Sequence, residues 1–175
     1  KKKKKTQRMT GAYAYVRQQF GMPIGMFEGV QSSMGKIGGT NYILESMRRL
    51  TISALCQGQS PSVVTAMTKY HMTEMGREVL EHAMDIHAGK GIQLGPHNYL
   101  GHAYMATPVS ITVEGANILT RNLMIFGQGA TRCHPYVLKE MKAAANPNED
   151  EGMREFDGLL MKHIGFAASN VFGSC

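Results

Sequence analysis

One carboxylate in the chain has the setting of a reactive group. Glu114 follows the β-branched and apolar run at residues 109–113 and is followed at once by Gly115 and a helical pattern. At such a junction a carboxylate either caps the next helix, whose N-terminal N–H groups favour the ionised form, or serves as a base in a low-dielectric cleft. The second role relies on burial, which raises the pKa of a carboxyl group toward a value useful for taking a proton. The residues alone leave both roles open, and capping is the commoner one.

Apolar residues recur with helical spacing along most of the chain, and this periodicity predicts the elements that must hold Glu114. We expect a long helix over residues 27–56 and a second over residues 60–88, with Ser60 as N-cap and Pro61 at the first helical position. The predicted fold class is all-α, an up-and-down four-helix bundle. The other expected segments are a glycine-rich loop at 89–96, a short helix at 98–106, an extended connector at 109–113, and helices at 115–126, 135–145 and 151–168.

Size and charge exclude several classes of protein. The chain has 175 residues, enough for one domain with a single core, and a net charge of +6. Most of that charge is the opening run of lysines, so the rest lacks the spread of basic residues that a nucleic-acid-binding face needs. We expect residues 1–8 to be a solvated tail or an appended remnant. No apolar run reaches the roughly 18 residues that span a bilayer, and no signal-peptide pattern opens the chain.

The cysteine and histidine pattern predicts no metal centre. The cysteines are widely spaced, form neither a zinc motif nor a disulfide framework, and fit a reducing, cytosolic setting. The histidines lack acidic partners at ligand spacing, so we expect structural roles for them. The residues concerned are Cys56, Cys133 and Cys175, and His71, His82, His87, His97, His102 and His134.

Three separated segments together indicate a family. The first reads Arg-Gln-Gln-Phe-Gly-Met-Pro-Ile-Gly from Arg17, the second reads Ala-Met-Asp-Ile-His-Ala-Gly-Lys-Gly-Ile from Ala83, and the third is Val-Glu-Gly from Val113 on to Arg121. In order and spacing they closely resemble the C-terminal helical domain of acyl-CoA dehydrogenases.

The resemblance also suggests how the chain is organised. It assigns residues 9–145 to the acyl-CoA dehydrogenase C-terminal helical domain. Residues 146–175 become a linker and the start of an additional C-terminal helical region, after the polar stretch that begins at residue 146. The segments at 127–136 and 156–165 resemble the large bacterial fatty acyl-CoA dehydrogenases of β-oxidation.

The resemblance implies a catalytic role for Glu114. In this family the matching residue removes the α-proton of a fatty acyl-CoA while the β-hydrogen leaves as hydride to FAD, which gives a trans-2-enoyl-CoA. The backbone N–H of the base residue also donates to the thioester oxygen, a preorganised oxyanion contact. Gly115 would allow the sharp turn there, and Gly115 and Arg121 are the implied substrate-binding residues.

The first two segments match family segments that contact FAD across a subunit interface. Arginine suits a pyrophosphate because its guanidinium is planar and permanently charged, although Arg17 could equally form a surface ion pair. The second segment departs from the family pattern, which commonly has glutamine and then two glycines where this chain has Asp85 and Ala88-Gly89. The implied cofactor-binding residues are Arg17, Gln19, Phe20, Asp85, Ala88 and Gly89.

The resemblance also implies binding partners and a location for the protein. The expected partners are a fatty acyl-CoA, an electron-transfer flavoprotein or equivalent acceptor, and further copies of the chain in a homo-oligomer. The expected location is cytoplasmic, with peripheral association with the inner membrane left open. Acyl-CoA oxidase chemistry and a helical self-association module without activity are the alternatives, and the intact Glu114-Gly115 pair favours the enzyme.

Overall fold

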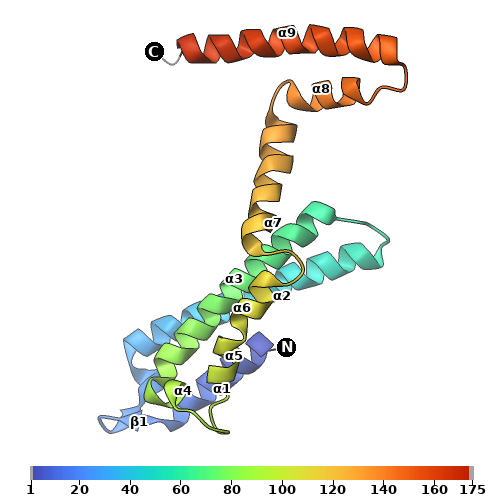
Figure 1. The fold of residues 1–175 in the computed structure, drawn as a ribbon. Coiled ribbons are helices and arrows are strands. Elements are labelled where there is room, and N and C mark those ends of the chain that lie inside the picture. The colour runs from blue at the N-terminus through green and yellow to red at the C-terminus, as the bar shows by residue number, and fades with distance from the viewer. Residues whose placement is uncertain (1, 174–175) are drawn as a thin grey trace. The chain divides into compact units, whose positions relative to one another are not determined.

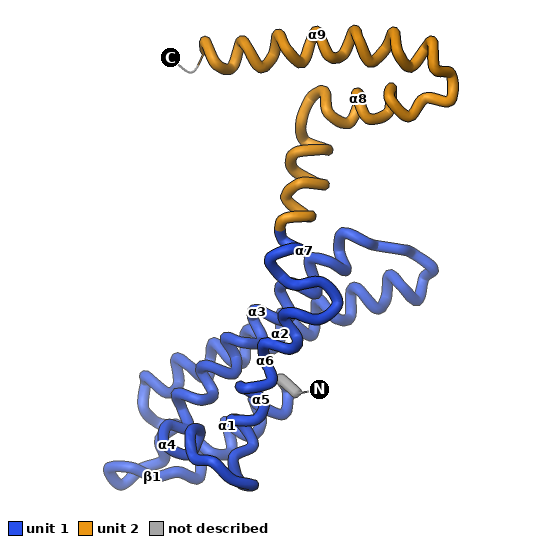
Figure 2. Tube along the Cα trace, viewed as in Figure 1, with its two compact units in different colours: residues 1–121 blue, residues 122–175 orange. Residues whose placement is uncertain are grey.

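The computed structural model describes residues 2–173, in two units that comprise residues 1–121 and 122–175 (Figure 2). Lys1, on which part of the expected tail falls, and Cys175 lie outside the described residues. The division between the units falls inside helix α7 (Asn117–Met124), whereas the sequence suggested a boundary near residue 146.

Unit 1 is built on an antiparallel pair of long helices, α2 (Glu28–Cys56) and α3 (Ser62–His87) (Figure 1). Both helices were predicted from periodicity, and both are confirmed. The N-cap of α3 is Pro61, one residue later than expected. The short connection between the two helices forces them to lie side by side, so their apolar faces are buried against each other.

Helix α1 (Lys2–Val16) packs on both α2 and α3. Residues 2–8 are therefore helical and not a solvated tail, while the alternative that they are an appended remnant stays a prediction. Thr6 is only 5% exposed, and the ammonium of Lys4 lies 3.3 Å from the Glu45 carboxylate of α2. A run of lysines can extend a helix when the neighbouring helix offers a carboxylate and a surface to pack on.

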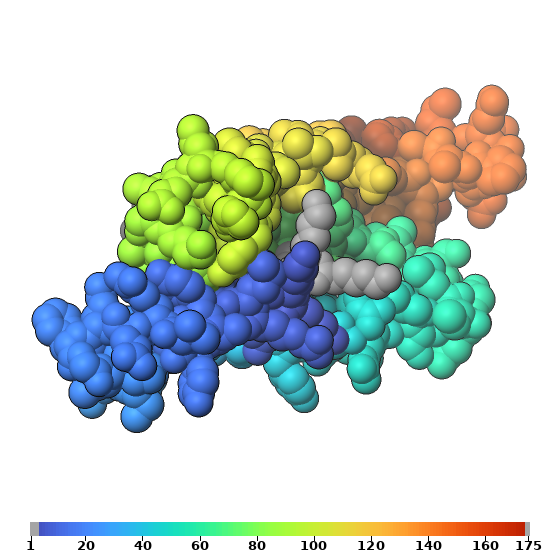
Figure 3. All heavy atoms as spheres, turned by 90° about the horizontal axis from the view of Figure 1, so that it is seen from below, coloured from blue at the N-terminus to red at the C-terminus, as the bar shows by residue number. Residues whose placement is uncertain are grey.

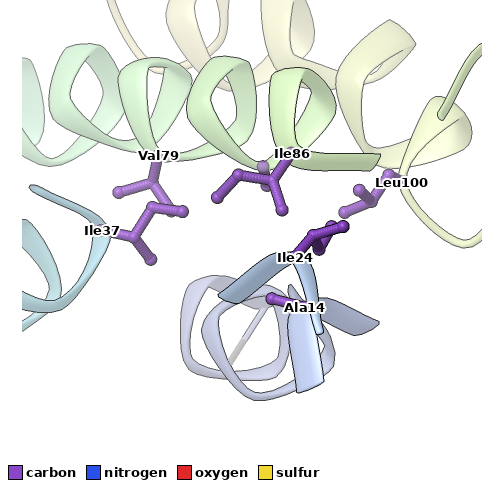
Figure 4. Packing of buried hydrophobic residues seen from close by; sticks show 7 residues of the cluster. Ala14, Ile24, Ile37, Val79, Ile86 and Leu100 are labelled. Carbon is purple, nitrogen blue, oxygen red and sulfur yellow. The ribbon is translucent and has the colours of Figure 1, made fainter. Parts of the chain in front are cut away.

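A small hairpin follows α1 and closes one end of the core. Strands β1 (Gln18–Gln19) and β2 (Met22–Pro23) pair antiparallel, and the 3-10 helix η1 (Ile24–Met26) leads into α2. Figure 4 shows residues from α1, η1, α2 and α3 converging with Leu100 in this core. The buried apolar residues of the cluster are Ala14, Ile24, Ile37, Val79, Ala83, Ile86 and Leu100.

Three short helices follow α3: α4 (Gly89–Ile92), α5 (Gly101–Met105) and α6 (Thr107–Thr112), of which α5 and α6 pack on α3. The expected extended connector at residues 109–113 is wrong, because most of it is helix α6. Pro108 sits in the first turn, where proline needs no N–H partner, and the Thr112 hydroxyl donates back to the Pro108 carbonyl at 3.0 Å.

In unit 2 the helical path of α7 continues as the π-helix η2 (Ile125–Cys133). Helices α8 (Val137–Ala144) and α9 (Glu149–Gly173) then pack against each other, with His163 Nδ1 2.8 Å from Glu140 Oε1. Gly152 of α9 is buried against the Ala143 carbonyl of α8.

Most of the described residues are helical and the strands are limited to the short β1–β2 pair, which confirms the all-α fold class. Within residues 2–173 no helix combines the length and the hydropathy that crossing a bilayer requires.

Candidate functional site

The segment that carries Glu114 is a tight left-handed turn between α6 and α7. Glu114 has φ 54° and Gly115 has φ 90°, so two consecutive residues adopt a conformation that L side chains rarely take. The Glu114 side chain is exposed in this chain, and within residues 2–173 its carboxylate makes no capping hydrogen bond to α7. The capping alternative therefore gains no support here.

A second feature is a groove of about 510 Å³ at the C-terminal end of α3. It brings together Arg17 and Gln19 from the first sequence segment with Ala88 and Gly89 from the second. Figure 3 shows the blue segment around residues 10–30 beside the yellow-green segment around residues 90–105 on one face of unit 1. Four of the six cofactor-binding residues expected from the sequence thus line a single concave surface.

The groove has a positive lining. Arg17 and Lys90 both face it, and within the described residues neither forms an ion pair with a carboxylate. The surface ion pair considered for Arg17 is therefore not formed among residues 2–173. Two unpaired cations with the amides of Gln19 and Gln93 make a donor set that suits a phosphate-bearing ligand.

His87 closes the floor of the groove and is held in one protonation state. Its Nδ1 donates to the Ala83 carbonyl at 2.7 Å, because a carbonyl oxygen can only accept, and its Nε2 accepts from the Tyr99 hydroxyl at 2.6 Å. Tyr13 stacks on the ring at 4.2 Å. Burial lowers the pKa of His87, the Ala83 hydrogen bond opposes this effect, and the charge of Lys90 adds to the lowering. The imidazole is therefore neutral at pH 7, a structural role as the sequence suggested.

Backbone strain coincides with the candidate residues. Among the described residues the only non-glycine positions with positive φ are Phe20 at 51°, Ala88 at 47° and Glu114 at 54°. All three were selected from the sequence as site residues. Strained backbone of this kind costs about 1–3 kcal/mol per residue and concentrates at functional sites.

Two expected cofactor-binding residues do not line the groove. Phe20 is 91% exposed at the tip of the β1–β2 turn, where its ring meets Phe27 edge-on with the ring centroids 6.2 Å apart. Asp85 is exposed on α3 and is absent from the lining. Both side chains are free to contact a molecule outside this chain.

The Glu114 turn does not lie at the groove. It docks on the first half of α3, where the Lys69 ammonium donates to the Gly115 carbonyl at 2.6 Å, whereas the groove includes His87 at the end of that helix. At a rise of about 1.5 Å per residue, the stretch of α3 from Lys69 to His87 spans about 27 Å. Arg121 is exposed on α7, close in sequence to the Glu114 turn.

Sequence reasoning missed several residues that the fold brings to these sites. Lys90 lies in the segment from Ala83 that resembles an FAD-contacting family segment, but it was not among the residues expected to bind the cofactor; its place between two glycines next to Ala88 was the available signal. Lys69 gave no signal, because its partners lie far along the chain. The missed residues are Tyr13, Lys69, Lys90, Gln93 and Asn117.

The acidic, histidine and cysteine side chains do not gather into a metal centre. Across residues 2–173 no group of three or more of them has an arrangement that could hold a metal ion.

Solved structures share the architecture of this chain. The acyl-CoA dehydrogenase from Geobacillus kaustophilus is 21% identical with a TM-score of 0.69, over 73% of this chain and 33% of that one. The FAD complex of PigA is 21% identical with a TM-score of 0.66, over 73% and 33%. The glutaryl-coenzyme A dehydrogenase glutaryl-CoA complex is 21% identical with a TM-score of 0.65, over 75% and 33%. The chain thus spans about a third of the length of the structures it matches, and at this identity the likeness shows the fold.

Two family profiles match the sequence itself. Residues 131–175 match the bacterial-type C-terminal region of acyl-CoA dehydrogenases, and residues 6–126 match the acyl-CoA dehydrogenase C-terminal domain. Because the second match covers most of the chain, this protein belongs to the acyl-CoA dehydrogenase family, whose cofactor is FAD, and it represents the family's C-terminal helical domain.

Proposed function

We propose that this chain is the C-terminal domain of an FAD-dependent acyl-CoA dehydrogenase that oxidises fatty acyl-CoA to trans-2-enoyl-CoA, with Glu114 as the base. The observation that carries the proposal is the strained turn at Glu114 and Gly115, which presents an exposed carboxylate from a fixed backbone. An exposed acid on such a turn is available to a substrate that covers it.

Glu114 would take the α-proton of the thioester onto its carboxylate. An α-C–H beside a thioester is a weak acid, so the enolate-like oxygen needs hydrogen-bond donors as the proton leaves. The backbone N–H of Glu114 supplies one such donor in the proposal. When bound, FAD accepts the β-hydrogen as hydride. Closure of substrate and upstream domains over Glu114 would exclude water from the carboxylate.

The groove at the end of α3 would hold the phosphate-bearing part of a flavin. Its unpaired cations, Arg17 and Lys90, and the amide of Gln19 suit a pyrophosphate, so the residues present fit the group. Since the groove and the Glu114 turn are about 27 Å apart along α3, one flavin would use the groove and a different one the base. This arrangement supports a homo-oligomer in which each chain contacts its partner's flavin.

The same proposal also covers the substrate, the pathway, the electron acceptor and the remaining site residues. We assign the substrate to fatty acyl-CoA, the pathway to β-oxidation and the electron acceptor to an electron-transfer flavoprotein or an equivalent. The bacterial-type match over residues 131–175 supports a bacterial enzyme of this kind. Gly115 and Arg121 remain the proposed substrate-binding residues, and Phe20 and Asp85 remain proposed contacts to a flavin outside this chain.

The test uses the longer enzyme that carries this domain. Glu114→Gln should lower dye reduction with palmitoyl-CoA by at least about 100-fold, because the amide cannot take the α-proton. The matched control is Glu78→Gln, which neutralises an exposed acid on α3 and should leave turnover unchanged. Unchanged turnover in the Glu114 variant, with flavin bound, would remove the assignment and favour the inactive self-association module.

A further inference from the structure

We propose that Lys69 of α3 is a positioning residue that holds the Glu114–Gly115 turn in its left-handed conformation. The proposal rests on the proposed function, since the turn matters to the reaction only if Glu114 is the base.

All three donors of the Lys69 ammonium are used on this turn. Its Nζ donates to the Gly115 carbonyl at 2.6 Å, to the Asn117 side-chain oxygen at 2.6 Å and to the Ile111 carbonyl at 3.1 Å. An ammonium has three N–H bonds, and here each finds one uncharged oxygen. The cation is therefore saturated by the turn, and no donor is left for a substrate.

The three oxygens bracket Glu114 along the chain. Ile111 is in the last turn of α6, where carbonyls lack helical partners and a cation is favourable. Gly115 directly follows Glu114, and Asn117 is the first residue of α7. The Lys69 ammonium thus links the end of α6 to the start of α7, and Glu114 lies between the residues that it contacts.

Asn117 gives the attachment a second link. Asn117 is 3% exposed, and its Nδ2 donates to the Thr73 hydroxyl at 2.8 Å and to the Glu74 carboxylate at 2.7 Å. With Nδ2 on those two α3 residues, the amide oxygen faces Lys69. The Asn117 side chain therefore connects the turn to α3 through both its amide oxygen and its amide nitrogen.

The backbone of the turn requires hydrogen bonds of this kind to keep its conformation. A positive φ at a residue with a Cβ is a strained conformation, so it persists only when surrounding contacts determine it. Without Lys69, the Gly115 carbonyl would keep only a long 3.4 Å hydrogen bond from the Thr120 hydroxyl. The turn could then relax, and the Glu114 carboxylate would move away from the α-carbon of a bound thioester.

The test compares variants of the complete flavin-loaded enzyme. Lys69→Met keeps the length of the side chain but removes the cation, and should lower kcat by about 100-fold, as an ångström-scale displacement of a catalytic group does. KM should change little, because Lys69 does not touch substrate. The control Lys36→Met removes an exposed lysine of α2 and should behave as wild type.

A kinetic isotope effect separates positioning from loss of folded enzyme. With α-deuterated acyl-CoA, a displaced base slows proton removal, so the isotope effect on kcat should rise in Lys69→Met. A smaller active fraction would lower kcat with an unchanged isotope effect, and that result would overturn the proposal. Wild-type kcat in Lys69→Met, with Glu114→Gln inactive, would overturn it while leaving the proposed function intact. Activity in Glu114→Gln would instead refute the proposed function.

A second variant covers the case in which Lys69→Met does not fold. Asn117→Ser shortens one acceptor and leaves Lys69 its two backbone carbonyls. The kcat of this variant should be about 10-fold below wild type, a smaller loss than in Lys69→Met, and its isotope effect on kcat should be raised. Wild-type values of both quantities in this variant would refute the positioning role.

Discussion

At the scale of single residues, three positions store backbone strain, and each belongs to a region that the proposal uses. Phe20 turns the hairpin, Ala88 ends α3 beside the groove, and Glu114 joins α6 to α7. Each is held by its surroundings: Phe20 by strand pairing, Ala88 by backbone hydrogen bonds to Met84 at 2.9 Å and from Gly91 at 2.8 Å, and Glu114 through the contacts of Lys69 with the residues around it. Strain of this kind lowers stability, and its occurrence at three candidate sites favours a functional role for these positions.

A substitution of Ala88 measures the strain at this residue directly. Its φ of 47° and ψ of −129° suit glycine, because a Cβ crowds the backbone there. Ala88→Gly should therefore raise the free energy of unfolding of the chain by about 1 kcal/mol, measured by urea denaturation.

The matched control is Ala12→Gly on the exposed side of α1, where glycine weakens the helix and should cost about 1 kcal/mol. If both variants lost stability alike, Ala88 would not be strained in the folded chain.

At the scale of elements, α3 organises unit 1. Its first half holds the Glu114 turn through Lys69, and its last turn supplies His87 to the groove. Its second half packs Val79, Ala83 and Ile86 into the core. A single rigid helix that carries both contacts fixes two candidate sites at a constant separation.

In unit 2 the packing of α8 on α9 depends on a buried glycine. A Cβ at Gly152 would lie 2.7 Å from the Ala143 carbonyl oxygen and 3.0 Å from the Asn146 Cβ. Gly152→Ala should therefore destabilise this helix pair by about 1–3 kcal/mol, measured by hydrogen exchange of the α8 and α9 amides.

Gly158 is the control on the same helix. It is exposed with no atom near its added Cβ, so Gly158→Ala should slow exchange by stabilising α9 by about 1 kcal/mol. Slower exchange in Gly152→Ala would contradict the close contact between the two helices.

At the scale of the whole molecule, both proposed sites include side chains that are exposed in this chain. Arg17 and Gln19 are exposed around the groove, and Glu114 is exposed on its turn. In the proposal, further domains and a second copy of the chain supply the other walls.

Flavin binding tests this view. Mixed with FAD and passed through a desalting column, the purified chain should retain far less than one flavin per chain, because a half-open groove buries too little of the ligand. Visible flavin absorbance measures the retained fraction. Stoichiometric yellow protein would mean that the chain holds FAD without the other domains.

Local patterns in the sequence were enough to predict the long helices and the family. Apolar periodicity located α2 and α3, and the Glu114-Gly115 pair with the Arg17 and Ala88 segments identified the acyl-CoA dehydrogenase domain. Periodicity works for these helices because each buries one face continuously, so the spacing of apolar side chains records the fold.

Other features depended on contacts between distant segments. The pattern at residues 109–113 was read as extended, but packing on α3 makes it the helix α6. The groove needs α1 and the end of α3 side by side, and the fastening of the Glu114 turn needs Lys69. Neither can be read locally, because a side chain's partners across the core are set by how the helices pack rather than by its neighbours in sequence.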